Sequence, residues 1–191
     1  MIGRMFRESV LMIVALTIVT GLAYPVLITG IALGIFSDQA RGSMVMLDGK
    51  AVGSALIGQS FSDPGHFWGR LSASAPQPYN AVASGGSNQG PLDAALLDKV
   101  KAAAQTLRDA DPQNTALIPV DLVTASASGL DPDISLAAAY YQAGRIARVR
   151  KLPLQRVKDL IAASTTGATT TFIGEPRVNV LRLNLALDRE R

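Results

Sequence analysis

One uninterrupted apolar segment near the amino terminus constrains this 191-residue chain more than any other feature. No residue from Ser9 to Ser37 is charged, and 20 of the 27 residues over 10–36 are apolar. About 20 helical residues cross the apolar core of a bilayer, which is about 30 Å thick. We therefore expect one transmembrane helix over residues 10–36, preceded by a short stretch over residues 1–9.

The main alternative for this segment is a cleaved signal peptide. The apolar part of a signal peptide is about 7–15 residues long and ends at a cleavage site made of small residues. Here the apolar run is longer, and the candidate cleavage site Ala32-Leu33-Gly34 lies inside it. The pattern favours a retained membrane anchor.

Basic residues near the two ends of the segment indicate its orientation. Arg4 and Arg7 immediately precede it, whereas Arg41 and Lys50 follow at a greater distance. Lys and Arg gather on the cytoplasmic side of membrane helices. The bias predicts a cytoplasmic amino terminus over residues 1–9 and an extracytoplasmic body over residues 37–191.

Three residues inside the segment favour contact with another membrane helix. Pro25 frees a backbone carbonyl, which a neighbouring helix or a water molecule can satisfy. Gly30 and Gly34 lie four residues apart and allow a second helix to approach closely. Glycine and proline are also common in membrane helices generally, so a purely compositional explanation stays open.

The body has the pattern of a mixed α/β (α+β) domain with a small sheet. A hairpin is expected over residues 43–59 around the turn signal Asp48-Gly49, followed by an irregular segment over residues 60–80. Apolar periodicity predicts helices over residues 91–111, 131–151 and 154–163. Residues 120–124 are expected to form a short strand or an extended loop. Alternating leucines over residues 181–187 predict a final strand.

Composition and motifs exclude several kinds of chemistry. The chain has no cysteine, which excludes disulfides, thiol catalysis and cysteine zinc sites, and its single histidine, His66, excludes a histidine-rich metal site. Gly49-Lys50 is followed by Ala51, where a phosphate-binding P-loop needs Ser or Thr for Mg²⁺. The pair Asp131 and Asp133 lacks the rest of a calcium loop and is better explained by a helix cap at Asp131. We expect no catalytic residue and no metal ligand on this chain.

Two further patterns leave alternative functions open. The loop Ser84, Gly85, Gly86, Ser87 and Asn88 precedes a predicted helix and could present backbone N–H groups to an anion, but it lacks the lysine and the spacing of a phosphate loop, so a structural or interface loop explains it better. Six basic residues without an intervening acid surround Pro153, which suggests a helix-turn-helix DNA-binding protein or a basic face. These residues are Arg145, Arg148, Arg150, Lys151, Arg156 and Lys158. An extracytoplasmic body argues against DNA.

A series of short motifs resembles the C chain of the Kdp potassium-transporting ATPase, and the series runs almost from end to end. The matching stretches are Gly21-Leu22-Ala23-Tyr24-Pro25, residues 53–61, Phe67-Trp68-Gly69-Arg70, Tyr79-Asn80 with residues 84–88, residues 119–131, Val178-Asn179-Val180 and residues 183–188. Leu71 replaces a proline expected after the Gly-Arg pair. This departure concerns local loop geometry.

The resemblance implies a non-catalytic accessory subunit of a high-affinity, ATP-driven potassium transporter in the bacterial inner membrane. Its implied partners are a potassium-channel-like subunit and a P-type ATPase subunit, which the C chain joins. The family is described as a catalytic chaperone that raises the affinity of the pump subunit for ATP.

The implied effect on ATP affinity conflicts with the predicted topology. No cofactor is expected to bind tightly, and ATP shared with the pump subunit would meet this chain at Ser84–Asn88. ATP is cytoplasmic, however, whereas the body is expected outside. We therefore expect the body to cap the outer mouth of the ion pathway and to act on ATP affinity indirectly.

Two alternative functions stay open for the whole chain. They are a membrane-anchored, periplasmic protein that binds a small anion or nucleotide, and an anchored DNA-binding protein.

Overall fold

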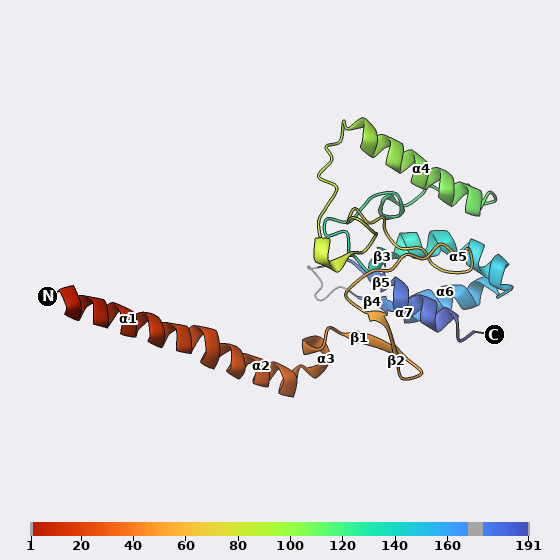
Figure 1. The fold of residues 1–191 in the computed structure, drawn as a ribbon. Coiled ribbons are helices and arrows are strands. Elements are labelled where there is room, and N and C mark those ends of the chain that lie inside the picture. The colour runs from red at the N-terminus through yellow and green to blue at the C-terminus, as the bar shows by residue number, and fades with distance from the viewer. Residues whose placement is uncertain (1, 168–173, 191) are drawn as a thin grey trace. The chain divides into compact units, whose positions relative to one another are not determined.

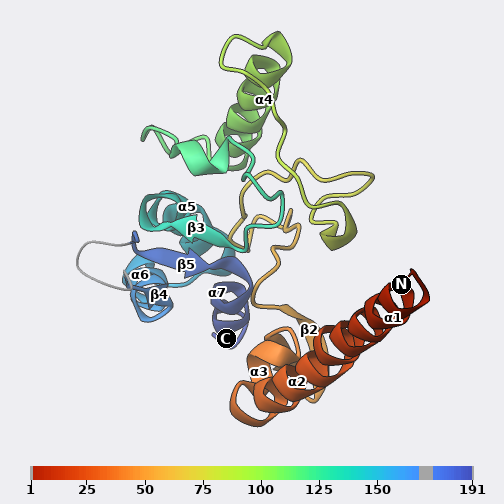
Figure 2. The ribbon, with the colours of Figure 1, turned by 90° about the vertical axis from the view of Figure 1, so that its left-hand side faces the viewer.

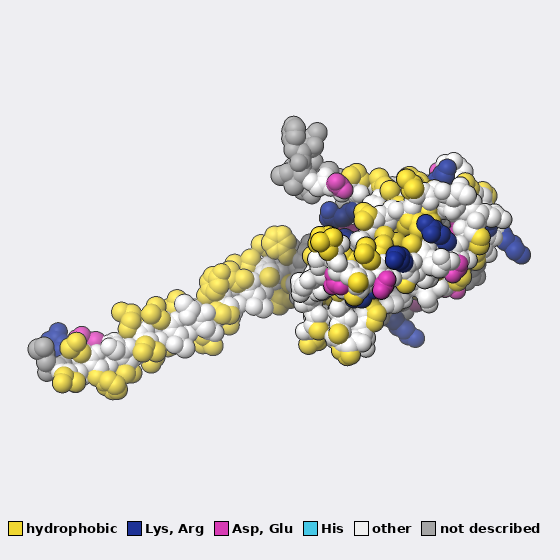
Figure 3. Space-filling view, turned by 90° about the horizontal axis from the view of Figure 1, so that it is seen from above, with side chains coloured by type: hydrophobic (Ala, Val, Ile, Leu, Met, Phe, Trp, Pro, Cys, Tyr) yellow, Lys and Arg dark blue, Asp and Glu magenta, His cyan; other side chains and the backbone are white. Residues whose placement is uncertain are grey.

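The computed structural model describes residues 2–167 and 174–190, which fall into two compact units divided between Met44 and Val45. The first unit is a helix from Ile2 to Ile35, followed by the short helix α3 (Ser37–Ala40). The long helix comprises α1 (Ile2–Ile18), a π-helical turn (Val19–Ala23) and α2 (Tyr24–Ile35) (Figure 1). Figure 3 shows apolar side chains along its length, with charged ones only near its free end. Its length and composition suffice to cross a membrane.

The π-helical turn in the middle of this helix follows from Pro25. Proline has no N–H, so the helical hydrogen-bond ladder must be rearranged just before it. The N–H of Tyr24 reaches the carbonyl of Val19, five residues back. The hydroxyl of Thr20 also donates to the carbonyl of Leu16 at 2.7 Å. The helix thus has a local bulge at the motif that contains Pro25.

The hairpin is confirmed. Strands β1 (Met44–Leu47) and β2 (Lys50–Ser54) form a two-stranded sheet, and the second strand ends five residues earlier than expected. Asp48 and Gly49 both have positive φ, at 49° and 76°. Positive φ at both central residues is the requirement of a type I′ turn, which matches the twist of the paired strands.

The core of the second unit lies between a three-stranded antiparallel sheet and three helices. Strand β5 (Arg177–Asn179) is central, between β3 (Asp133–Ser135) and β4 (Thr165–Thr166), and Ile134 pairs with Val178. Helices α5 (Leu136–Arg150), α6 (Leu154–Ala163) and α7 (Val180–Leu187) pack around this sheet (Figure 2). Phe67, Ile146, Ile161, Val178 and Leu183 are fully buried. The predicted mixed domain with a small sheet is confirmed.

Helix α4 (Ala94–Ala110) is much less buried than the other helices of this unit. It begins after Asp93, whose side chain accepts a hydrogen bond from the N–H of Ala95, so the predicted start at Pro91 is three residues early. Among its residues only Leu107 is buried. A long segment containing the 3₁₀ turn η2 (Ala81–Ala83) leads to its amino terminus (Figure 1).

The predicted final strand is wrong, because residues 180–187 form α7. The buried residues Val180, Leu183, Asn184 and Leu187 follow the i, i+3, i+4, i+7 spacing of a helix. Asn179 caps this helix by accepting a hydrogen bond from the N–H of Arg182. In the predicted strand, Asn184 would alternate with the leucines and face solvent. In the structure its side chain is buried.

Two other local predictions are also wrong. Residues 120–122 form a 3₁₀ turn, η3, in which the N–H of Val123 donates to the carbonyl of Val120. Asp121 in this turn accepts hydrogen bonds from the N–H and hydroxyl of Ser135 at 2.8 and 3.2 Å. The helix expected from Asp131 starts at Leu136, after β3, and Ser135 is its cap. The Asp131 carboxylate instead accepts from the N–H of Asp133.

Candidate functional site

Two buried amide side chains hold the Phe67-Trp68 dipeptide against the core. Asn184 accepts from the N–H of Phe67 at 2.8 Å and donates to its carbonyl at 3.0 Å. Gln142 accepts from the N–H of Trp68 at 2.8 Å and donates to its carbonyl at 3.1 Å. The amides satisfy these backbone groups as a neighbouring strand would. Helices α5 and α7 thereby fix the motif, and we call this arrangement the amide clamp.

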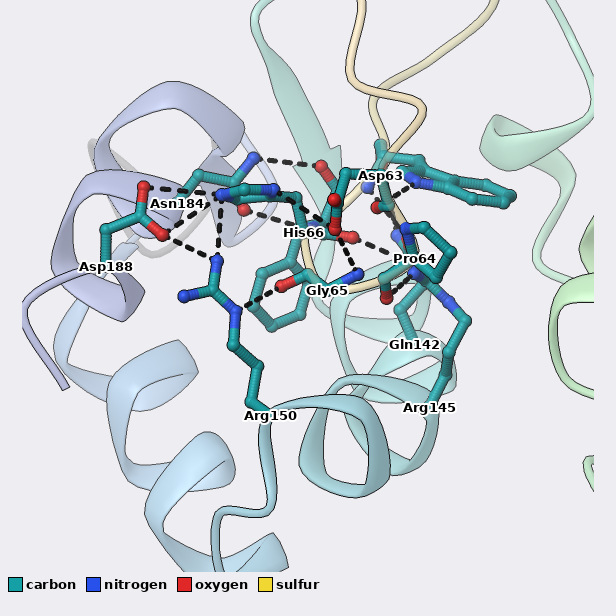
Figure 4. A network of polar contacts seen from close by, with 11 residues as sticks. Asp63, Pro64, Gly65, His66, Gln142, Arg145, Arg150, Asn184 and Asp188 are labelled. Atoms are coloured by element: carbon teal, nitrogen blue, oxygen red, sulfur yellow. Dashed lines mark hydrogen bonds and ion pairs between the residues drawn. The ribbon is translucent and has the colours of Figure 1, made fainter. Parts of the chain in front are cut away.

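A buried arginine supports the same segment from α5 (Figure 4). Arg145 is 3% exposed, donates to the carbonyls of Pro64 and His66 and to the Gln142 oxygen, and lies 4.3 Å from the centre of the Trp68 ring. Burial lowers the pKa of Arg145 to about 10, against the opposing effect of nearby acidic groups. Arg145 therefore helps to hold the loop over residues 64–68 in place.

The single histidine lies in an ion-pair cluster at the edge of this support (Figure 4). His66 Nε2 is 3.0 Å from Asp188 Oδ1 and 2.8 Å from Arg150 Nη2. Arg150 also contacts Asp188 at 2.5 Å and donates to the carbonyl of Gly65 at 2.8 Å. The cluster joins the loop to the end of α5 and to the residue after α7. These contacts give His66 a structural environment.

The predicted basic face is largely used in contacts within the body. Arg148 pairs with the buried Asp111, and Arg156 forms a two-pronged pair with Glu190 at 2.7 and 2.9 Å. Together with Arg145 and Arg150, four of the six basic residues have such partners. A DNA-binding surface needs cations that are free to meet phosphates, so the structure lends the helix-turn-helix alternative no support.

A second junction connects the Phe67–Arg70 motif to the longest matching motif, residues 119–131. Arg70 pairs with the Asp131 carboxylate at 3.1 Å. Leu71 forms a parallel bridge with Ala125, so the departure from the expected proline lies where the two motifs meet. The N–H of Gly58 donates to the carbonyl of Leu130 at 2.8 Å. Three stretches that are distant in the sequence thus meet at one place.

Tyr79 closes this junction. Its hydroxyl donates to the carbonyl of Arg70 at 2.5 Å, and its ring covers Gly58, where a Cβ atom would lie 2.3 Å from a ring carbon. Burial raises the pKa of Tyr79 to about 12, and the negative charge of Asp131 acts in the same direction.

The raised pKa of Tyr79 predicts an alkaline loss of stability. Unfolded tyrosine loses its proton near pH 10, whereas folded Tyr79 keeps it to about pH 12. Between these values the unfolded state binds fewer protons, so this residue lowers the free energy of unfolding as the pH rises. Subtracting the phenolate absorbance titration of Tyr79→Phe from that of the unchanged protein should leave a step near pH 12. A step near pH 10 would contradict the buried environment.

The predicted loop over Ser84–Asn88 packs backbone to backbone against residues 126–129. The N–H of Gly85 donates to the carbonyl of Ser128 at 2.9 Å, and the Ser84 hydroxyl donates to the same oxygen at 3.0 Å. A Cβ atom on Gly86 would lie 3.0 Å from the carbonyl of Ala127. The glycines permit this close packing, and the N–H of Gly85 is used within the body. Ser87 and Asn88 are exposed.

The predicted helix-packing residues Pro25, Gly30 and Gly34 belong to the first unit. A Cβ atom on Gly30 or Gly34 would meet nothing within 4 Å. Both positions are therefore open to another helix. Pro25 lies directly after the π-helical turn.

The amide clamp is the feature that sequence reasoning missed. A polar residue at the centre of an apolar helical face, such as Asn184 between Val180 and Leu187, would have been a signal for it. Within residues 2–167 and 174–190, no group of three or more His, Cys, Asp or Glu side chains could hold a metal ion.

Comparison with known proteins places the whole chain in one family. A family model described as K⁺-transporting ATPase, c chain, matches residues 6–189. The potassium-transporting ATPase KdpC subunit of Polaromonas naphthalenivorans is 60% identical over 182 residues, which cover 95% of this chain and 93% of that protein. The KdpC subunit of Variovorax paradoxus is 59% identical, with 97% and 96% covered. That of Methylococcus capsulatus is 58% identical, with 97% and 98% covered. The chain belongs to the KdpC family of potassium-transporting ATPase subunits.

Proposed function

We propose that this chain is a non-catalytic accessory subunit that assembles and stabilises the channel-like and P-type ATPase subunits of a potassium transporter. The observation that carries the proposal is the match to KdpC over residues 6–189. The polar side chains of the body are consistent with this role. Asn184, Gln142 and Arg145 are buried, and each bonds backbone groups of residues 64–68.

The first unit suits a single-pass anchor in the inner membrane. Its helix is long enough to span a bilayer, and Arg4 and Arg7 favour a cytoplasmic amino terminus. The body then lies in the periplasm. Gly30, Gly34 and the bulge before Pro25 give neighbouring membrane helices places of close approach.

The proposed effect on ATP affinity is indirect. A body that contacts two states of the complex differently shifts the equilibrium between them, and ATP binding to the pump subunit changes accordingly. A position over the outer mouth of the ion pathway allows such contacts. The N–H of Gly85 is already bonded to Ser128, which argues against an anion cradle at Ser84–Asn88. ATP, in this proposal, stays with the pump subunit.

The complex purified with and without this chain tests the proposal. Without the chain, potassium-stimulated ATPase activity should be lost, and adding the full chain in detergent should restore it and lower the KM for ATP. Full potassium-stimulated activity in the complex that lacks the chain would refute the proposal. Saturable binding of ATP to the isolated full chain would favour the nucleotide-binding alternative.

A further inference from the structure

A long uncharged segment projects from the body. Residues 71–92, which we call the uncharged arm, contain no Asp, Glu, Lys or Arg. The arm leaves the body at the bridge between Leu71 and Ala125 and runs to the amino terminus of α4 (Figures 1 and 2). Val82 and Leu92 are 96% and 94% exposed. The segment thus leaves two large apolar side chains almost wholly exposed and carries no charge beside them.

A second uncharged segment extends the same surface. Residues 122–130 contain no charged side chain. They bind the arm through the Ser72 hydroxyl, which donates to the carbonyl of Gly129 at 2.6 Å, and through the bond from Gly85 to Ser128. Ala127 and Ser128 are exposed beside the arm. The two segments together form an uncharged face.

The arm is held in one conformation although few of its side chains are buried. The Ser72 hydroxyl accepts from the N–H of Tyr79, and the Ser74 hydroxyl accepts from the N–H of Asn80, both at 2.9 Å. Tyr79 and Asn88 have φ values of 58° and 53°, a region that costs most residues energy. A surface organised in advance loses little entropy on binding.

A groove lies between the arm and α4. Its volume is about 380 Å³, and its lining includes Leu71, Ala73, Leu96, Ala103, Val123 and Ala125. The polar residues of the lining are Ser72, Ser87, Gln89, Lys99 and Thr106. Lys99 is its one charged residue, and its ammonium group donates to the side-chain oxygen of Gln89 at 3.1 Å. Interfaces are strongest where an apolar or aromatic side chain of one partner fills such a pocket on the other.

We infer that the uncharged face and its groove dock an uncharged, apolar segment of another subunit of the potassium-transporting complex. This inference rests on the proposed function. The lack of charged side chains on this face indicates which kind of partner it binds. Anionic lipid headgroups and nucleic acids are bound through clusters of Lys and Arg, whereas the arm has none and the groove has the single Lys99, which is bonded to Gln89. The core of a protein interface, by contrast, is depleted in charge.

Photocrosslinking in the complete membrane complex tests the inference. Benzoylphenylalanine placed at Val82 or Leu92 should crosslink to another subunit of the complex. The matched control is Leu117, which is equally exposed at 94% but lies outside the arm. Its crosslinks to other subunits should be at least tenfold weaker. Crosslinks from the arm only to lipid, only to a second copy of this chain, or no more often than from Leu117 would overturn the inference.

Introducing negative charge into the uncharged face provides a second, independent test. With benzoylphenylalanine at Ser87, the variant Val82→Asp/Leu92→Asp should lower the crosslink yield at least tenfold, and Leu117→Asp should leave it unchanged. Equal yields in the two variants would overturn the inference. If other subunits do not copurify with the unchanged chain at all, the proposed function itself fails, which distinguishes the two failures.

Discussion

Replacing Asn184 with alanine should lower the free energy of unfolding of the body by about 2–6 kcal/mol. The substitution leaves the buried N–H and carbonyl of Phe67 without partners, and each unsatisfied buried group costs about 1–3 kcal/mol. A domain of ordinary stability has about 5–15 kcal/mol in total. The variant should therefore unfold at a much lower denaturant concentration.

Unfolding of the full chain in non-ionic detergent, followed by tryptophan fluorescence, measures this effect. Trp68 is the single tryptophan and belongs to the amide clamp, so the signal reports on the clamp itself. Arg182→Ala on the same helix is the control, because Arg182 is exposed and surface changes are usually within about 0.5 kcal/mol. Equal midpoints for Asn184→Ala and Arg182→Ala would show that the clamp contributes no stability.

Replacing Gly58 with alanine is the second change with a large expected effect. The added Cβ atom would lie 2.3 Å from the Tyr79 ring and 2.6 Å from the carbonyl oxygen of Asp131. Neither neighbour moves easily, since the ring is tied to Arg70 through its hydroxyl and the oxygen belongs to the backbone. Overpacking of this kind costs about 1–3 kcal/mol or more.

The matched control for Gly58→Ala is Gly90→Ala. A Cβ atom on Gly90 meets nothing within 4 Å. This alanine should be neutral, or stabilise by about 0.4–1 kcal/mol through the unfolded state. Thermal unfolding of the full chain compares the two. A Gly58→Ala variant as stable as Gly90→Ala would mean that the junction has room that the structure does not show.

The sequence patterns predicted correctly those helices and strands that depend only on residues close together in the sequence. The apolar run predicted a helix over residues 10–36, and the structure has one over residues 2–35. Asp48-Gly49 predicted the hairpin. Both signals depend only on residues that are neighbours in the sequence. Helix α6 was also predicted, from its apolar spacing and Pro153. The final element failed because the leucine alternation fits a strand as well as the helix that forms.

The parts that could not be predicted depend on partners far away in the sequence. Asn184 is buried because it satisfies Phe67, which is 117 residues away. The basic run around Pro153 is explained by Asp111, Asp188 and Glu190, which lie on other elements. Glycines 85 and 86 were predicted as a possible anion loop, whereas their close packing against residues 127–129 emerges only in three dimensions.

In the proposed function, the body acts on the transporter from the side of the membrane opposite to ATP. Because the chain has no cysteine, a single introduced cysteine is its only thiol. Gln113→Cys places it on an exposed position of the body, and Met5→Cys places it before the membrane segment. In intact cells with a permeable outer membrane, a maleimide that cannot cross the inner membrane should label Gln113→Cys and leave Met5→Cys unlabelled. Labelling of Met5→Cys but not of Gln113→Cys would place the body in the cytoplasm and contradict the proposed topology.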